Sequence, residues 1–507
     1  MWEETARACA LDALGMTRRD AERLVLGRLG SVQVVYCHSW QYDDPPGRLA
    51  ERIGAPPGHR HYSGIGGSTP QAMISGTARR MLSGELDLAL VVGGEALATK
   101  RVARREGRRL QWSHPPMTKS AFPWPFPFHP AEVSHQVLQA WLTFALFDDA
   151  RRAHAGVGLG EYRESLGETL SALSAVAAEN PFAWFRVKRS AGEIVQATPG
   201  NRMVAYPYTK LMTAIMDVDM AAGVILATHQ AAEDLGVPAE RRVYLRGWCY
   251  AEDPPYVAER EDLWRSAAME VAYAGALRAA GVDVDDVAHL DLYACFAASV
   301  NFARDALGMS DDDPRPLTVT GGLPYHGGPG SNPVTHSLAT MVDALRQDPG
   351  SLGLVSGVGM HMSKHSAGVY STEPGLIEPP DEPAVQARAD CAGRRVVLDG
   401  YEGDAVVLAA SVVHAPDGVP ERAVLVCEAP DGARCYAVIG DSGAPSAPSA
   451  PSAPSAPSAP SLPARSSQAA YVASILREIE QAELAGRRVH LHPAPGSNGA
   501  TVNVAEL

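Results

Sequence analysis

Cysteine is scarce in this chain, and its few copies are scattered. The 507 residues include 7 cysteines, an odd number, and no two of them form a Cys-x-x-Cys pair. This pattern excludes a disulfide framework and a zinc site built from paired thiols. Because free thiols are typical of a reducing compartment, we expect a cytoplasmic protein.

Positive charge is also in short supply. Lys and Arg number 44 against 58 Asp and Glu, which gives a net charge of −14. Broad nucleic-acid binding is therefore not expected. Basic residues gather once, in residues 99–110 (TKRVARREGRRL), which form either a solvated helix face or a site for an anionic ligand such as nucleotide phosphates. No apolar run reaches membrane-spanning length, and the amino-terminal stretch lacks the pattern of a signal peptide.

Apolar residues, by contrast, are plentiful. They make up 46% of the chain, and the length predicts roughly two to four domains. Strand and helix patterns alternate in two blocks, residues 1–240 and 241–372, which is typical of an α/β fold with covered sheets. A long insertion at about 116–209 includes the aromatic, proline-rich stretch 122–130, and we expect it to cover or line a site. The high use of Ala, Arg, Gly and Pro suggests a GC-rich bacterium.

The carboxyl-terminal part has a different pattern. Short strands separated by Asp-Gly turns predict a small β-rich, OB-like domain over residues 384–507. A strict Ala-Pro-Ser repeat at 444–461 interrupts it. Proline at every third position predicts a solvated, extended linker, although a proline-rich ligand for a partner is an alternative.

Four stretches together resemble the thiolase superfamily. They are residues 63–96 (SGIGGSTPQAM…), 292–300 (LYACFAASV), 318–341 (TVTGGLPYHGGPGSNPVTHSLATM) and 353–371 (GLVSGVGMHMSKHSAGVYS). The combination is similar to acetyl-CoA acetyltransferases of the sterol-carrier-protein thiolase branch. The added carboxyl-terminal domain narrows the resemblance to the thiolase-like proteins of the first type.

This resemblance implies two similar βαβαβαββ halves, layered α-β-α-β-α, with the insertion forming part of a coenzyme A site. One departure concerns the start, because the family has a strand before its first helix and this chain opens inside that helix. Either the start is mis-assigned, which we favour, or a central strand is absent and leaves a neighbour's edge unpaired.

The resemblance also locates the catalytic positions, and three of them hold glycine. The nucleophilic cysteine corresponds to Gly66, the activating histidine to Gly328 and the late acid/base cysteine to Gly357. Because thioester chemistry needs a thiolate and a base, ordinary thiolase activity is not expected. Glycine at these places leaves space for a ligand or for backbone that approaches closely.

Several nearby residues stay as candidates. The family's His-Asp-Cys-Phe sequence is Tyr293-Ala-Cys295-Phe here, so Cys295 is either an acid/base or a small buried residue, and the Tyr293 hydroxyl is a possible oxyanion donor. His326 is a displaced base, a ligand contact or a packed histidine. Ser68 is a substitute nucleophile or a helix cap. Ligand-binding candidates are Ser68, Gly327 and Pro329, and the histidines of residues 361–366 do not have the spacing of a metal site.

Three functions follow from these residues. The first is an acyl-CoA-binding or acyltransferase-like protein without thioester chemistry, which requires no cofactor beyond coenzyme A or acyl-CoA as its ligand. The second is an active acyltransferase that uses Cys295 with Tyr293 or His326. The third is a non-enzymatic protein that binds a partner through its carboxyl-terminal domain. The chain is expected to be a monomer or a dimer.

Overall fold

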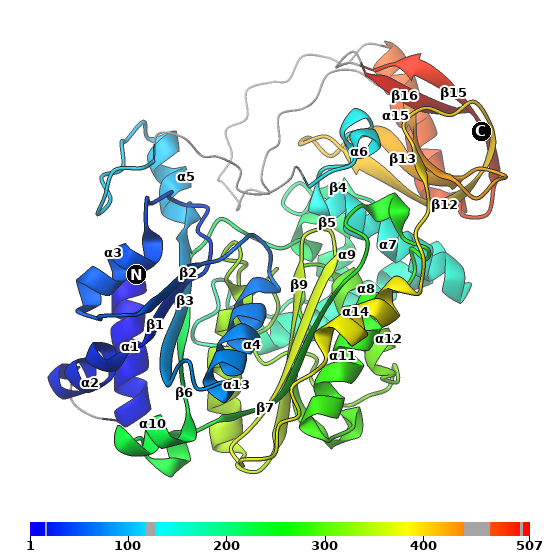
Figure 1. Cartoon of the computed structure of the whole chain (residues 1–507). Coiled ribbons are helices and arrows are strands. Elements are labelled where there is room, and N and C mark those ends of the chain that lie inside the picture. Colours follow the sequence, from blue (N-terminus) through cyan, green and yellow to red (C-terminus); the bar gives the residue numbers. More distant parts are fainter. Residues whose placement is uncertain (16–17, 118–126, 441–466, 497–499, 507) are drawn as a thin grey trace.

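In the computed structural model, two sheets with helices on both faces form the main body, and a third sheet packs on one end (Figure 1). Residues 1–15, 18–117, 127–440, 467–496 and 500–506 are described. The Ala-Pro-Ser repeat and most of the proline-rich stretch 122–130 lie outside these residues. Within the part that is described, no helix is long and apolar enough to cross a membrane.

The first sheet has the strand order β2-β1-β3-β6, in which β6 runs antiparallel to β3 and the other pairs are parallel. Both parallel strands β1 and β3 are buried, as expected for strands covered on both faces. Strand β3 is mostly apolar, whereas β1 carries the buried polar residues Ser31 and Gln33, and the Gln33 amide donates a 2.7 Å hydrogen bond to Thr77. Helices α1 and α3 pack on the outer face of this sheet. The bounds are α1 (Trp2–Leu14), α2 (Arg18–Val25), β1 (Ser31–Val34), α3 (Pro45–Ile53), β2 (His59–Tyr62), β3 (Leu88–Ala96), α5 (Leu97–Arg105), β6 (Asp219–Ala227) and α10 (His229–Asp234).

The second sheet has the order β7-β10-β9-β8. Strand β10 is antiparallel to both of its neighbours, and β9 is parallel to β8. Helix α11 packs on β7 and β10, and its alanine-rich sequence lets the helix lie close to the sheet. The bounds are β7 (Tyr244–Glu252), α11 (Ala267–Ala280), β8 (Val287–Asp291), α12 (Ala297–Leu307), β9 (Leu352–Gly359), β10 (Lys364–Ser371) and α14 (Glu382–Asp390).

Two helices lie between the sheets. Helix α4 (Thr69–Leu82) contacts β3 and β6 on one side and β9 and β10 on the other, and α13 (Pro333–Gln347) contacts β6, β8, β9 and α4. The expected layered α/β fold is therefore present. Both helices start with a proline in their first two positions, where the missing N–H donor costs nothing.

The first and second sheets each have four described strands, whereas the expected βαβαβαββ unit has five. In the second half, the segment after α12 does not join the sheet. Instead, the carboxylate of Asp291 accepts hydrogen bonds from the backbone N–H groups of Val319 and Thr320 and from the hydroxyls of Thr318 and Thr320. In the first half, α1 follows no described strand, and the second edge of β6 has no described partner strand.

The insertion is mostly helical and covers one end of the second half. Its longest helices, α7 and α8, bring Phe144, Phe147 and Leu170 into the main core beside Phe296 and Phe302. The bounds are α6 (Pro130–Ser134), α7 (Ala140–Ala155), α8 (Leu159–Glu179), α9 (Ala191–Val195), β4 (Met203–Ala205) and β5 (Tyr208–Thr209).

The third sheet combines the carboxyl-terminal residues with two strands of the insertion. Its order is β11-β14-β16-β15-β12-β4-β5, and β13 pairs with β12 and β14. The two Pro-Asp-Gly sequences lie at the β12–β13 and β13–β14 turns, with Gly418 and Gly432 at positive φ. The bounds are β11 (Val397–Leu398), β12 (Gly403–His414), β13 (Pro420–Glu428), β14 (Arg434–Gly440), α15 (Ser467–Gln481), β15 (Arg488–Pro495) and β16 (Thr501–Glu506).

An ion-pair network fastens this sheet to the insertion. Arg152 on α7 binds the carboxylates of Asp149 and Glu483, and Asp149 also accepts a hydrogen bond of 2.8 Å from the backbone N–H of Ala410. The Arg152 side chain is only 4% exposed. The two carboxylates therefore compensate for the cost of burying its positive charge. The insertion and the carboxyl-terminal residues therefore form one packed unit.

Candidate functional site

The loops that resemble the catalytic loops of thiolases come together at the amino-terminal end of α4. Residues 66–68 of the first half lie directly against residues 357–359 of the second half. A Cβ atom added to Gly66 would lie 3.3 Å from the Cα atom of Gly359, and one added to Gly357 would lie 2.9 Å from the Cα atom of Ser68. Both distances are shorter than ordinary carbon contacts. The backbone leaves no room for a side chain at Gly357, and at Gly66 the close contact and a φ of 137° both disfavour one.

Tyr293 covers the neighbouring glycine. A Cβ atom added to Gly67 would lie 2.1 Å from the Tyr293 hydroxyl oxygen and 2.4 Å from the adjacent ring carbon. Tyr293 is 8% exposed, and burial raises the pKa of its hydroxyl well above the ordinary value. The phenol is therefore neutral and fills the space next to Gly66.

Cys295 is buried in the same core cluster as Tyr293. Its sulfur contacts the hydroxyl of Ser299 at 3.7 Å, and the same hydroxyl donates a 2.7 Å hydrogen bond to the carbonyl of Tyr293. Burial raises the pKa of the Cys295 thiol to about 12. At neutral pH the thiol stays protonated, which is the unreactive form.

The glycine-rich loop does not place His326 beside Gly66. Its ring packs edge-on against His336, with centroids 5.3 Å apart, and its Nδ1 atom lies 3.4 Å from the carbonyl oxygen of Gly327. Burial lowers the pKa of both histidines. Gly328 donates its N–H to the carbonyl of Ile215 at 2.8 Å, so the position of the family's histidine faces a loop of the first half.

Gly327 and Pro329, the ligand-binding candidates in the glycine-rich loop, both contact other parts of the protein. Gly327 has a φ of 111°, and a Cβ atom there would meet the sulfur of Met220 at 2.7 Å. The carbonyl of Pro329 accepts the N–H of Asn332 at 2.9 Å, at the start of α13. The loop keeps its bend because glycine adopts this backbone conformation without strain.

Ser68 occupies the cap position before α4, but its side chain does not make the hydrogen bond of a helix cap. Its hydroxyl points toward Gly359. Sequence reasoning missed Ser331, whose hydroxyl accepts a 3.1 Å hydrogen bond from the N–H of Gly66. Nothing in the sequence pairs positions so far apart, and only the folded loops bring them together.

The histidines of residues 361–366 have separate structural partners. His361 is hydrogen-bonded to Thr143 at 2.8 Å, and His365 lies 3.0 Å from the carboxylate of Asp253. His365 belongs to strand β10, and so only the start of this stretch is a loop. The two side chains stabilise contacts between elements and do not converge on one point.

An exposed aromatic and basic segment of the insertion lies beside the glycine-rich loop. The backbone N–H groups of Trp184 and Phe185 donate hydrogen bonds of 2.8 and 3.0 Å to the carbonyls of His326 and Tyr325. Phe182, Trp184 and Val187 are 70%, 39% and 48% exposed. The side chains of Arg186 and Lys188 are exposed as well, and no described residue forms an ion pair with either.

The basic cluster at 99–110 has a different environment. Its first part, up to Arg105, lies on helix α5. Arg101 pairs with Asp217, and Arg108, beyond the helix, pairs with Glu106. Arg104 and Arg105 are exposed on the last turn of this helix, where cations interact favourably with the helix dipole. These contacts are those of a solvated helix face.

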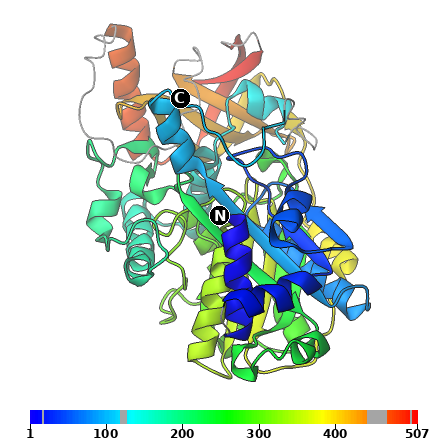
Figure 2. The same ribbon diagram turned by 90° about the vertical axis from the view of Figure 1, so that its left-hand side faces the viewer.

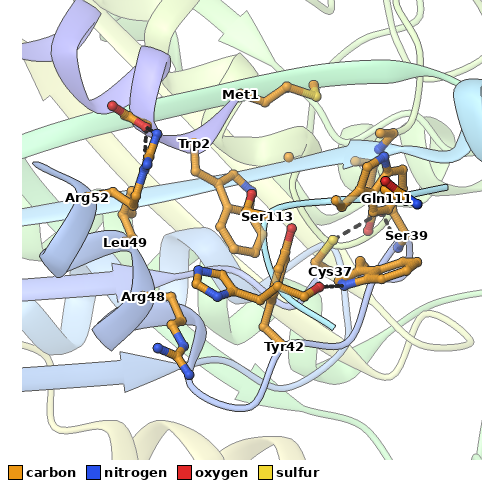
Figure 3. A pocket seen from close by; sticks show the side chains of 17 residues that line it. Met1, Trp2, Cys37, Ser39, Tyr42, Arg48, Leu49, Arg52, Gln111 and Ser113 are labelled. Carbon is orange, nitrogen blue, oxygen red and sulfur yellow. Dashed lines mark hydrogen bonds and ion pairs between the residues drawn. The ribbon is translucent and has the colours of Figure 1, made fainter. Parts of the chain in front are cut away.

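An aromatic-lined cavity of about 440 Å³ lies beside the start of α1. Its lining residue Glu95 lies against the glycine-rich loop, because a Cβ atom on Gly330 would come within 2.5 Å of the Glu95 carboxylate. Figure 3 shows Trp2, Tyr42 and Leu49 around the cavity, with Arg52 at one side. Trp40 and Trp112 form the opposite wall, with ring centroids 4.8 Å apart. The carboxylate of Glu95 is buried there and accepts hydrogen bonds from the loop that follows β1.

The comparisons with known proteins agree with the loop resemblance. No protein-family model matches this chain, and no curated protein matches it in sequence. One solved structure that matches is the monomeric SCP2-thiolase-like protein type 1 from Mycobacterium smegmatis. It is 28% identical with a TM-score of 0.80, and the match covers 100% of this chain and 94% of that chain. This chain has an SCP2-thiolase-like fold. The resemblance inferred from the four stretches is thereby confirmed.

Proposed function

We propose that this SCP2-thiolase-like chain binds a coenzyme A-type ligand on its surface and does not form a thioester with it. The observation that carries the proposal is the contact between the loops at 66–68 and 357–359, with Tyr293 over Gly67. At the place where a thiolase would hold its acyl group, backbone and a neutral phenol occupy the space.

The exposed segment at 182–188 supports the ligand assignment. Trp184 and Phe182 offer aromatic surfaces on which an adenine ring stacks, and Arg186 and Lys188 supply unpaired cations for phosphate groups. The segment is hydrogen-bonded to the glycine-rich loop through the backbone of His326. A ligand held there lies next to the loop that in thiolases would carry the activating histidine.

The alternative of an active acyltransferase requires Cys295 as an acid/base or nucleophile. The burial of Cys295 disfavours it, because burial raises the pKa of the thiol to about 12 and keeps it protonated. The third alternative is a non-enzymatic protein that binds a partner through its carboxyl-terminal domain, and it predicts that coenzyme A does not bind.

Calorimetric titration with coenzyme A and acetyl-CoA tests the proposal. We expect binding that Arg186→Ala/Lys188→Ala weakens by about tenfold or more, since each lost phosphate contact costs on the order of 1 kcal/mol. The matched control is Arg104→Ala/Arg105→Ala, which removes two exposed cations from α5 and is expected to leave the affinity unchanged.

Intact-mass measurement after incubation with acetyl-CoA tests the chemistry separately. We expect no acetyl adduct on the wild-type chain. An adduct that Cys295→Ala abolishes would establish the active-acyltransferase alternative. Absence of any binding to coenzyme A would overturn the proposed ligand and favour the non-enzymatic alternative.

A further inference from the structure

The glycines that stand at the catalytic positions of a thiolase are packed against other parts of the chain. A Cβ atom on Gly357 would meet the Cα atom of Ser68 at 2.9 Å, and one on Gly328 would meet the side chain of Leu323 at 3.3 Å. Carbon atoms in favourable contact are about 3.5–4.0 Å apart. A single added carbon atom is therefore already too close to its neighbours at both positions.

The surroundings of Gly66 come from both halves of the fold. Its N–H donates a 3.1 Å hydrogen bond to the hydroxyl of Ser331 in the glycine-rich loop. A Cβ atom on Gly66 would lie 3.3 Å from the Cα atom of Gly359, 3.6 Å from the hydroxyl of Thr69 and 3.8 Å from the backbone nitrogen of Met360. A group placed where that side chain would point therefore meets backbone of the second half.

Tyr293 adds a large side chain to these backbone contacts. Its hydroxyl oxygen and two ring carbons would lie 2.1, 2.4 and 2.5 Å from a Cβ atom on Gly67. Its backbone is held on both sides, because its N–H donates a 2.9 Å hydrogen bond to the hydroxyl of Ser356 and its carbonyl accepts one of 2.7 Å from the hydroxyl of Ser299. The ring is therefore fixed over Gly67.

The glycine-rich loop joins the exposed segment at 182–188 to this packed region. The N–H of Trp184 is bonded to the carbonyl of His326 in the loop, and Ser331, five residues further along, contacts Gly66. Five residues of chain span at most about 18 Å. Figure 2 faces the side on which helices of the insertion (teal) and α13 (yellow-green), the helix that follows the loop, both lie. A ligand with a long flexible arm that binds at 182–188 reaches the packed region with the end of its arm.

We propose that this chain selects coenzyme A with a free thiol over the thioesters of coenzyme A, and that Tyr293 is the residue that makes the selection. This inference rests on the proposed function and names the ligand of that same site. The free arm ends at its sulfur atom, whereas a thioester adds a carbonyl group and carbon atoms where protein atoms already lie, so the acyl form is rejected by overlap. The ligand is then the product of a reaction that releases coenzyme A from a thioester.

Calorimetric titration with a series of ligands tests this inference on the wild-type chain. The probes are coenzyme A, acetyl-CoA, hexanoyl-CoA and desulfo-coenzyme A, in which hydrogen replaces the thiol. We expect coenzyme A to bind at least about tenfold more tightly than acetyl-CoA, and hexanoyl-CoA to bind no more tightly than acetyl-CoA. Desulfo-coenzyme A is expected to match coenzyme A, because the selection acts by excluding the acyl group and not by recognising sulfur.

Substitutions of Tyr293 assign the selection to this residue. Tyr293→Ala opens the space over Gly67 and is expected to bring the affinities for acetyl-CoA and coenzyme A to within about twofold of each other. Tyr293→Leu, which shortens the side chain and keeps it apolar, is expected to act in the same direction and serves where the alanine variant does not fold. Tyr293→Phe keeps the ring and is expected to keep the preference. The matched control is Tyr436→Ala, which removes another buried tyrosine, on β14, and should leave the preference unchanged. Circular dichroism verifies that each variant is folded.

The results that would overturn the inference are distinct from those that would overturn the proposed function. Equal or tighter binding of acetyl-CoA to the wild-type chain overturns the inference alone, because the ligand then binds without selection. A preference that the alanine and leucine variants of Tyr293 both retain, or weaker binding of desulfo-coenzyme A than of coenzyme A, also overturns it. If neither coenzyme A nor its thioesters bind, the proposed function and the inference fail together.

Discussion

Substitution of Gly67 by alanine tests whether Tyr293 packs directly over Gly67. The backbone of Gly67 is not in the left-handed region, so alanine brings no conformational strain of its own. Its Cβ atom, however, would lie 2.1 Å from the Tyr293 hydroxyl and 2.5 Å from a ring carbon. Because Tyr293 is buried and its ring cannot move away freely, the overpacking is expected to cost about 1–3 kcal/mol of unfolding free energy.

A control and a double variant isolate this contact. Gly76 lies within α4, the helix that Gly67 precedes, and a Cβ atom there would meet nothing within 4 Å. Gly76→Ala is therefore expected to stabilise the chain by about 0.5–1 kcal/mol, through helix propensity alone. In the double variant Gly67→Ala/Tyr293→Ala the clash is absent, so its loss of stability is expected to be smaller than the sum of the single losses.

Guanidinium unfolding followed by tryptophan fluorescence and circular dichroism measures these differences. The reasoning would be refuted by a Gly67→Ala variant as stable as the wild type, or by losses that simply add in the double variant. Either result would mean that Tyr293 does not lie over Gly67, and the basis for excluding thioester chemistry would be lost.

Two further predictions concern the attachment of the third sheet. The Nε2 atom of His135 accepts a 2.8 Å hydrogen bond from the N–H of Asn503, and burial lowers the pKa of His135 to about 4. An unfolded histidine titrates near 6.5, so acidification from about pH 6.5 to 4 protonates the unfolded state first and is expected to remove about 3 kcal/mol of stability. His135→Gln should flatten this part of the pH–stability curve, and an unchanged slope would contradict the assignment. Arg152→Met leaves Asp149 buried without its cation and is expected to cost about 3–5 kcal/mol, while Arg80→Met, at an exposed ion pair, should cost about 1 kcal/mol or less. Limited proteolysis should then cut the carboxyl-terminal residues of the Arg152 variant first, and equal protection of both variants would contradict the role of the network.

The amino-acid sequence by itself determined the local elements and the fold class. Buried strands such as β3 are continuous apolar runs, and helices such as α4 and α13 are marked by proline at their start, so short-range rules suffice to place them. The same sequence indicated the loss of three catalytic side chains, since glycine at 66, 328 and 357 is visible without coordinates. It left open the roles of Cys295, Tyr293 and His326, each of which was either a candidate for the chemistry or a structural residue.

Only the tertiary structure separated these candidates. Tyr293 covers Gly67, the buried Cys295 thiol has a raised pKa, and His326 packs against His336. The tertiary structure also joined β4 and β5 of the insertion to the carboxyl-terminal sheet. The physical reason is the same in each case: packing and strand pairing depend on which residues meet across hundreds of positions, whereas periodicity and capping depend only on neighbours in the chain.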